Sequence, residues 1–210
     1  RDMYMRPEYW LADHDFDIFS RYQQNLQTRA GYSRPDSTGG YRGSPAKYYQ
    51  RFRMTSNHLS VNLTQEKDPG EALNGVTGFD YNSGHIALLD NGKLNDLVIG
   101  DYSLSFGQGL VLWSGGAFGK GREVTGTISK NERGIKPYSS AQEANFFRGF
   151  AASYGDQFEF TAFYSDRPRT ASVIAEDTTR FPSSSGFHRT ESEFVRKNNI
   201  DQNTVGGRIR

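Results

Sequence analysis

Apolar and polar residues alternate through residues 49–64 on both sides of Ser56 and Asn57. Because successive side chains point to opposite faces of a strand, a two-residue turn at these positions predicts a hairpin with one apolar and one polar face. Arg51 and Arg53 lie on the polar face of this hairpin. The apolar face consists of the pairs Phe52–Val61 and Met54–Leu59.

A second hairpin is predicted with its turn at Asn91 and Gly92, since both residue types tolerate positive φ. Asp80 and Asp101 fall on its polar face. Four apolar residues near the turn also fall on that face, namely Ile86, Leu88, Leu97 and Ile99. The opposite, apolar face starts with Tyr81, Ala87 and Leu89 and continues after the turn through Val98, Tyr102, Leu104 and Phe106.

The third hairpin is expected to turn at Gly155 and Asp156, with Arg148 and Glu159 on its polar face. Its apolar face is predicted to combine Phe147 and Ala151 with Phe158 and Phe160. In all three hairpins a register slip of one residue would exchange the two faces.

Other segments complete an all-β antiparallel meander in one domain, residues 1–210. A first strand is expected from His14 to about Gln27, and polar, glycine-containing stretches predict long loops. Ser140 with Glu143, and Thr190 with Glu193, have the spacing of a capping box, which predicts one or two short helices, the second over residues 191–197.

Composition limits the class of protein. Only 35% of residues are hydrophobic and no run of about 18 apolar residues occurs, so a transmembrane helix is not expected. A transmembrane barrel needs only about 9–11 alternating residues per strand and is compatible with this composition. The net charge of +1 gives no general attraction to nucleic acid. The last residues, 204–210, read like the start of a strand, so we expect the chain to be a piece of a longer protein.

Candidate chemistry in the sequence is sparse. The segment 115–121 lacks the spacing of a phosphate-binding loop, and in a strand His14 would point away from the aspartates beside it. The histidines have no recognisable serine–acid spacing, and the chain has no cysteine. We therefore expect no enzyme, no catalytic residue, no metal and no cofactor.

The charged residues on the polar faces permit two interpretations: the lumen of a barrel, or the wetted face of a soluble sheet. Aromatic residues at the ends of the apolar faces favour the lumen, because aromatic girdles flank the apolar band of transmembrane barrels. The lumen-lining candidates are Arg51, Arg53, Asp80, Asp101, Arg148 and Glu159. The lipid-facing candidates are Phe52, Met54, Leu59, Val61, Tyr102, Leu104, Phe106, Phe158 and Phe160.

The stretch from Gly100 to Leu110, with residues 112–115 after it, resembles a family of Bacteroidetes-type envelope proteins. Those proteins carry an N-terminal helix-hairpin-helix segment followed by an outer-membrane β-barrel. Residues 133–138 and 186–198 agree, and the resemblance spans roughly residues 40–210. It implies that Tyr102, Leu104 and Phe106 face lipid. The helix-hairpin-helix segment is missing here, which leaves a link to DNA handling unsupported.

We therefore expect part of a porin-like β-barrel in the bacterial outer membrane, which serves passage or assembly there. Its partners would be the lipid bilayer and other envelope proteins, and its charged lumen would be gated by the loops 107–136 and 167–203. One alternative is a soluble β-sandwich that binds carbohydrate or another ligand through Trp113 and Tyr138. A third reading is a component of a DNA-handling envelope channel.

Overall fold

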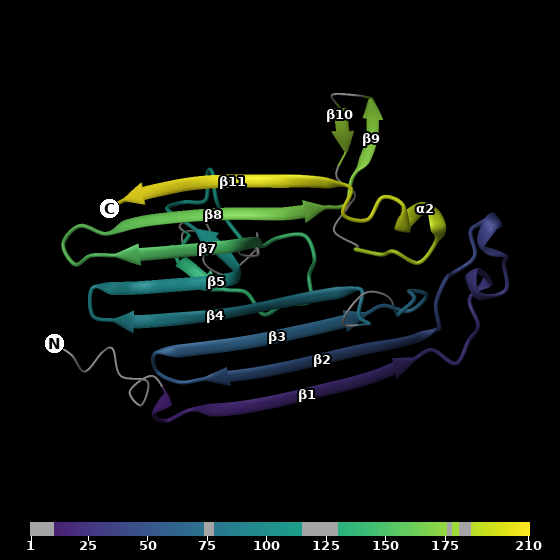
Figure 1. Ribbon diagram of the computed structural model, residues 1–210, viewed down its shortest axis with the longest axis horizontal. Coiled ribbons are helices and arrows are strands. Elements are labelled where there is room, and N and C mark those ends of the chain that lie inside the picture. Colours follow the sequence, from purple (N-terminus) through teal and green to yellow (C-terminus); the bar gives the residue numbers. More distant parts are fainter. Residues whose placement is uncertain (1–10, 74–77, 115–129, 176–177, 181–185) are drawn as a thin grey trace, which may run out of the picture.

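The computed structural model describes residues 11–73, 78–114, 130–175, 178–180 and 186–210. The main sheet is antiparallel and its strands follow the order β1-β2-β3-β4-β5-β7-β8-β11 (Figure 1). Its strands are β1 (Asp15–Gln24), β2 (Ala46–Thr55), β3 (Leu59–Lys67), β4 (Tyr81–Asn91), β5 (Leu94–Ser105), β7 (Phe147–Tyr154), β8 (Phe160–Arg169) and β11 (Ile200–Ile209). The smaller elements are β6 (Gly134–Pro137), β9 (Ser172–Ala175), β10 (Thr178–Arg180), η2 (Ala30–Tyr32), η3 (Asp36–Thr38) and α2 (Glu191–Phe194).

The antiparallel, all-β architecture predicted from the sequence is confirmed. Within the described residues the sheet is not closed, and its two edge strands are β1 and β11. β6 pairs only with the end of β5, and β9 with β10 forms a separate ribbon.

The two ends of the sheet differ in how the strands are joined. At one end, on the left of Figure 1, short turns join β2 to β3, β4 to β5 and β7 to β8. At the other end the connections are long and cover residues 25–45, 68–80 and 170–199, with η2, η3 and α2 among them. The strands therefore run up and down between a turn end and a loop end.

An unbroken row of apolar residues crosses one face of the sheet, which we call the open face. Each of the eight strands from β1 to β11 in the order above contributes one residue, and each residue is paired in register with the next. In strand order the row is Phe16, Met54, Val61, Ile86, Ile99, Phe150, Tyr164 and Val205. Several of these side chains are strongly exposed, with Ile86 at 56%, Ile99 at 59% and Val205 at 80%.

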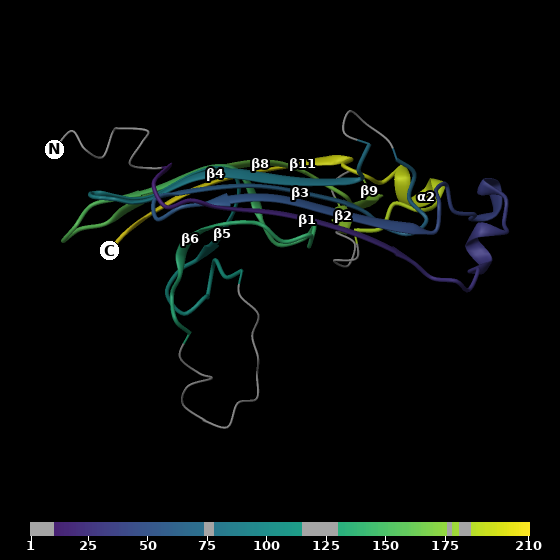
Figure 2. The same cartoon turned by 90° about the horizontal axis from the view of Figure 1, so that it is seen from below.

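The other face, here called the covered face, has a different chemistry. One row of paired residues across the same eight strands contains only polar residues and glycine: Asp17, Arg53, Asn62, His85, Gly100, Gly149, Ser165 and Thr204. Beside it β6 and the end of β5 fold away from the sheet on one side (Figure 2). They bury a small core made of Ala87, Val98, Tyr102, Leu104, Ile135, Ala151 and Phe163.

The first two hairpins keep their predicted faces but not their predicted registers. Met54 pairs with Val61 rather than with Leu59, and Asn91 pairs with Leu94 around a turn at residues 92–93. Each register differs from the prediction by two residues. Because the side-chain period of a strand is also two, the faces are unchanged.

The predicted faces of the third hairpin are wrong. The connection from β7 to β8 spans residues 155–159 instead of a two-residue turn, and Tyr154 pairs with Phe160. The register therefore shifts by an odd number of residues, and Phe160 lies in phase with Phe150 rather than with Ala151. Arg148 lies two residues from Phe150 on β7 and pairs with Asp101, so both of these predicted lumen-lining residues are at open-face register positions.

The two predicted helices have different outcomes. Thr190 caps α2 and forms the expected capping box with Glu193, although the helix ends at Phe194. The helix predicted at Ser140 is wrong. Backbone carbonyls there bind arginine side chains instead of helical amides, because Arg167 donates to the carbonyl oxygens of Ala144 and Phe146.

Candidate functional site

Of the predicted lumen-lining residues, Arg51 and Arg53 lie on the covered face. Both approach Asp17 of β1, with Nη2–Oδ2 distances of 2.9 Å for Arg51 and 3.9 Å for Arg53. The Arg53 side chain is 41% exposed, so water solvates it. This part of the covered face is a solvated surface that carries both signs of charge.

Glu159 also lies on the covered face, at the turn end. Its Oε2 atom accepts a hydrogen bond from Asn95 Nδ2 at 3.2 Å, and Arg208 lies 4.0 Å from its Oε1 atom. Arg208 lies closer to Glu132, which belongs to the segment 130–133 just before β6. The Arg208–Glu132 ion pair thus attaches the segment 130–133 to β11 of the main sheet.

Asp101, which is buried, forms an ion pair with the partly exposed Arg148 where β5 leaves the sheet. Gly100 has a φ of +106°, and a Cβ there would lie 2.3 Å from the carbonyl oxygen of Gly84, so only glycine fits this bend. Arg148 donates to both carboxylate oxygens of Asp101, at 2.6 and 2.8 Å. The pairing of β4 with β5 ends at His85 and Gly100. Beyond this point the ion pair links β5 and β7 to β4, because the Gly84 amide donates to Asp101 at 3.2 Å and Arg148 donates to the Asn82 carbonyl at 2.8 Å.

Three of the predicted lipid-facing residues were assigned to the wrong face. Tyr102 and Leu104 are 0% and 1% exposed and belong to the core on the covered face, and Phe106 packs against that core. The second hairpin is apolar on both faces, and its open face is the one that carries Ile86 and Leu88, which pair with Val61 and Leu59. The remaining candidates, Phe52, Met54, Leu59, Val61 and Phe160, lie at open-face register positions. Phe158 is 68% exposed in the turn before β8.

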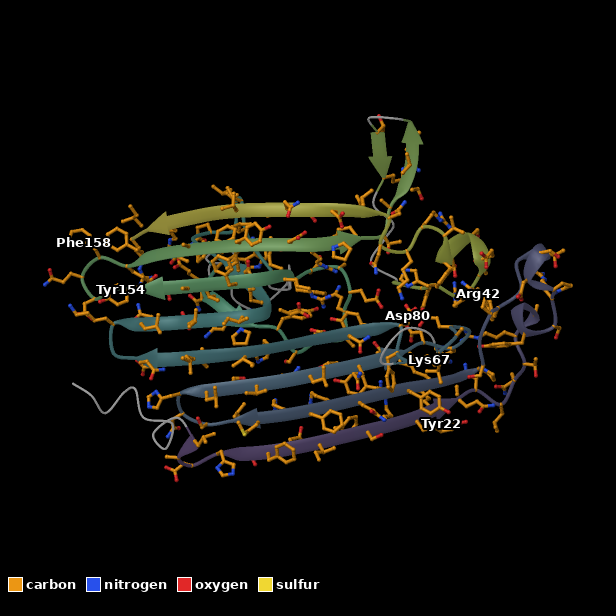
Figure 3. All side chains as sticks on the ribbon, viewed as in Figure 1. Tyr22, Arg42, Lys67, Asp80, Tyr154 and Phe158 are labelled. Atoms are coloured by element: carbon orange, nitrogen blue, oxygen red, sulfur yellow. The ribbon has the colours of Figure 1, made fainter. Side chains whose placement is uncertain are left out.

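Asp80 belongs to a separate cluster at the loop end of the sheet, where Figure 3 shows it close to the start of β4. Its Oδ2 atom lies 2.7 Å from His188 Nδ1, and its Oδ1 atom accepts from Lys197 Nζ. Both the Asp80 and the His188 side chains are 4% exposed. Burial alone would raise the pKa of the Asp80 carboxyl, but the hydrogen bonds from His188 and Lys197 outweigh it and lower the pKa.

Two more acidic residues adjoin this cluster. Glu71 accepts hydrogen bonds from the backbone amides of His188 and Asp68, at 2.9 and 2.8 Å. Burial and the charge of Asp80 raise the pKa of Glu71 to about 7. The same two causes, followed by the charge of Glu71, raise the pKa of Glu143 to about 8. Ligand atoms of Glu71, Asp80 and His188 lie within 4.8 Å of one another, but a metal ion would have to displace Lys197 from Asp80.

The raised pKa of Glu71 predicts that this cluster loosens as the pH rises. The folded protein binds the Glu71 proton more tightly than the unfolded chain, so the contribution to stability is complete below the unfolded pKa of 4.5 and falls as the pH passes about 7. We expect the amides of residues 186–198 to exchange faster at about pH 8 than at about pH 5.5, after correction for intrinsic exchange rates. Amides of β4 serve as the internal control. Equal protection of residues 186–198 at both pH values would contradict the prediction.

A cavity of about 210 Å³ lies beside the cluster, at the ends of β8 and α2. His188 and Thr170 both line it, and Thr170 Oγ1 lies 3.2 Å from His188 Nε2. Its charged lining residues are Glu143, Arg167, Arg169, Glu193 and Arg196. Sequence reasoning missed this site, because it combines residues from three loop segments and its hydroxyl group comes from a threonine.

Comparisons with protein-family models, curated proteins and solved structures give no match for this chain. Among the described residues, no helix is long and apolar enough to cross a membrane.

Proposed function

We propose that this sheet is part of the wall of a bacterial outer-membrane β-barrel, in which the open face contacts lipid and the covered face contacts water. The observation that carries the proposal is the row from Phe16 to Val205, in which eight successive strands present apolar side chains at paired positions. An outward apolar band opposite a polar interior is the pattern of such barrels.

The margins of the open face agree with this proposal. Tyr154 and Phe158 lie at the turn end and Tyr22 at the loop end of the sheet (Figure 3). Their exposed fractions are 54%, 68% and 59%. Aromatic side chains at both margins match the girdles at the two interfaces of a bilayer, and short turns at one end with long loops at the other match the usual layout of these barrels.

The covered face would line the interior and serve passage or assembly across the membrane. Arg51, Arg53 and Glu159 lie on this face, and charged groups are tolerated where water reaches them. The segment after β5 would narrow the interior of the barrel, because residues 106–114 and 130–133 cover part of the covered face. Residues 115–129, 176–177 and 181–185 of the predicted gating loops lie outside the described residues.

The soluble β-sandwich alternative is less well supported. A sandwich buries its apolar faces between two sheets, whereas Ile86, Ile99 and Phe150 of the open face are at least half exposed. Tyr138, one of its expected ligand-binding residues, stacks on Phe146 at 4.8 Å and donates its hydroxyl to the Gln142 carbonyl. No contact of the described residues favours DNA handling.

A pair of adjacent positions on β1 tests the proposal. Ile18 lies on the open face and Phe19 on the covered face, with exposed fractions of 59% and 42%. The chain has no cysteine, so Ile18→Cys and Phe19→Cys can each carry one environment-sensitive fluorophore. In lipid vesicles we expect nitroxide-labelled lipids to quench the probe at position 18 and aqueous iodide to quench the probe at position 19.

Phe19→Cys is the matched control, because it differs from Ile18→Cys by one residue on the same strand. Folding in buffer without lipid or detergent, with iodide quenching both probes equally, would refute the membrane proposal and leave a soluble sheet.

A further inference from the structure

We propose that the cavity at the loop end is an acyl-transfer site, with Thr170 as nucleophile, His188 as general base and Asp80 as the group that orients the imidazole. Thr170 and His188 come from the same connection, 18 residues apart, and Asp80 is separated from His188 by 108 positions. This activity lies beyond the proposed membrane role and does not depend on it.

The hydrogen bonds place each proton where the reaction needs it. His188 Nδ1 lies 2.7 Å from the Asp80 carboxylate, so Nδ1 carries the proton and Nε2 is left as the acceptor. Thr170 Oγ1, 3.2 Å from Nε2, then donates its proton to the imidazole. A hydroxyl, an imidazole and a carboxylate linked in this order form the catalytic arrangement of serine hydrolases, which is recognised by geometry and not by sequence position.

The Thr170 oxygen keeps a lone pair for attack. A hydroxyl oxygen has two lone pairs, and the Asn198 amide occupies one of them at 3.3 Å. The second lone pair is available to a substrate, because Thr170 lines the cavity. Asp80 is also held from its other side by Lys197, which fixes the carboxylate that orients His188.

The size and charge of the cavity indicate the class of substrate. A volume of about 210 Å³ suits a short acyl ester rather than a polymer segment. Arg169 and Arg196 line the same cavity, where Arg169 donates to the Ala144 carbonyl and Arg196 to Ser172. The positive charge that they give to the cavity would stabilise the oxyanion that forms on attack. We therefore expect a small carboxylic ester.

The reaction proceeds in two balanced steps. Thr170 Oγ1 forms a bond to the ester carbonyl carbon, and its proton passes to His188 Nε2. The ester C–O bond breaks, and the leaving alkoxide takes that proton as an alcohol. Water then attacks the acyl-threonine, gives a proton to His188 and releases the acid, while the Thr170 oxygen recovers the proton from His188.

The test uses p-nitrophenyl acetate with the full chain in detergent, where the lack of cysteine removes thiol background. We expect an acetyl group on the peptide that contains Thr170 after acid quench. Release of p-nitrophenol should fall about 100-fold or more in Thr170→Val and in His188→Gln. Thr170→Ser should retain turnover, because it keeps the hydroxyl.

Thr178→Val is the matched control, since it makes the same change as Thr170→Val at an exposed position of β10 that does not line the cavity. Its turnover should equal that of the unmodified chain. The proposal is overturned if the unmodified chain is no faster than Thr170→Val, or if acetyl groups appear on other side chains and not on Thr170. The position of the acetyl group is mapped on the unmodified chain, so this second result can overturn the proposal even if a variant does not fold.

Discussion

Arg148→Met is expected to lower the free energy of unfolding by about 1–3 kcal/mol, because it removes the cation beside a buried carboxylate, although the Arg148 side chain is 40% exposed and water screens part of the interaction. The Asp101 side chain is 1% exposed and takes two hydrogen bonds from Arg148. Methionine fills similar space but supplies no charge, so the Asp101 carboxylate keeps only the Gly84 amide as a partner. Urea titration of the chain in detergent, followed by tryptophan fluorescence, measures the loss.

Arg53→Met is the control for this experiment. Arg53 is about as exposed as Arg148, but its partner Asp17 is 38% exposed rather than 1% and lies 3.9 Å away, so the loss of Arg53 should cost about 0–1 kcal/mol. Adding Asp101→Asn to Arg148→Met should recover part of the stability, since the buried negative charge is then gone. Equal, small losses for Arg148→Met and Arg53→Met would show that the Asp101–Arg148 pair does not hold the sheet together where β5 departs.

Val205→Arg is expected to destabilise the protein in lipid vesicles by about 2–4 kcal/mol if position 205 lies near the bilayer midplane. Val205 is 80% exposed, and in water a substitution at so exposed a position changes stability by only about 0.5 kcal/mol or less. The large difference arises because an arginine on the lipid side must lose its hydration or distort the bilayer.

Thr204→Arg provides the comparison, because Thr204 is the neighbouring residue on β11 and lies on the covered face. We expect this arginine to cost less than about 1 kcal/mol, since it reaches water in the interior. Both free energies come from urea-driven unfolding out of vesicles. If both arginines prove equally harmless, the open face is in contact with water and the membrane assignment fails.

The strands could be predicted from the sequence because alternation is a local property, whereas the register depended on turns whose length alternation does not determine. At residues 155–159 the true connection differs from a two-residue turn by an odd number, which exchanged the faces of the third hairpin. At Ile86 and Ile99 both faces of the hairpin are apolar, so only the neighbouring strand β3 reveals which face continues.

The candidate sites on neighbouring strands could likewise be predicted in part from the sequence, whereas the site formed by the loops could not. The Arg51–Asp17 pair lies on neighbouring strands, and the polar face of Arg51 followed from its own hairpin. The Asp80–His188–Thr170 chain depends on how the loops 68–80 and 170–199 pack together, which no periodic pattern describes. The bend at Gly100 could not be predicted from the alternation either. A glycine is needed there because the carbonyl oxygen of Gly84, on the neighbouring strand, leaves no room for a Cβ atom.

The strand order has a consequence for how the chain reaches this structure. From β1 to β5 every strand pairs with the one that follows it in the sequence, so hairpins can form in succession as local units with little loss of chain entropy. The pairings of β5 with β7 and of β8 with β11 must instead close the connections of residues 106–146 and 170–199, and β11 can pair only after β8 has joined the sheet. We therefore expect the β2–β3 and β4–β5 hairpins to be protected from hydrogen exchange early in refolding, and β11 to be protected last.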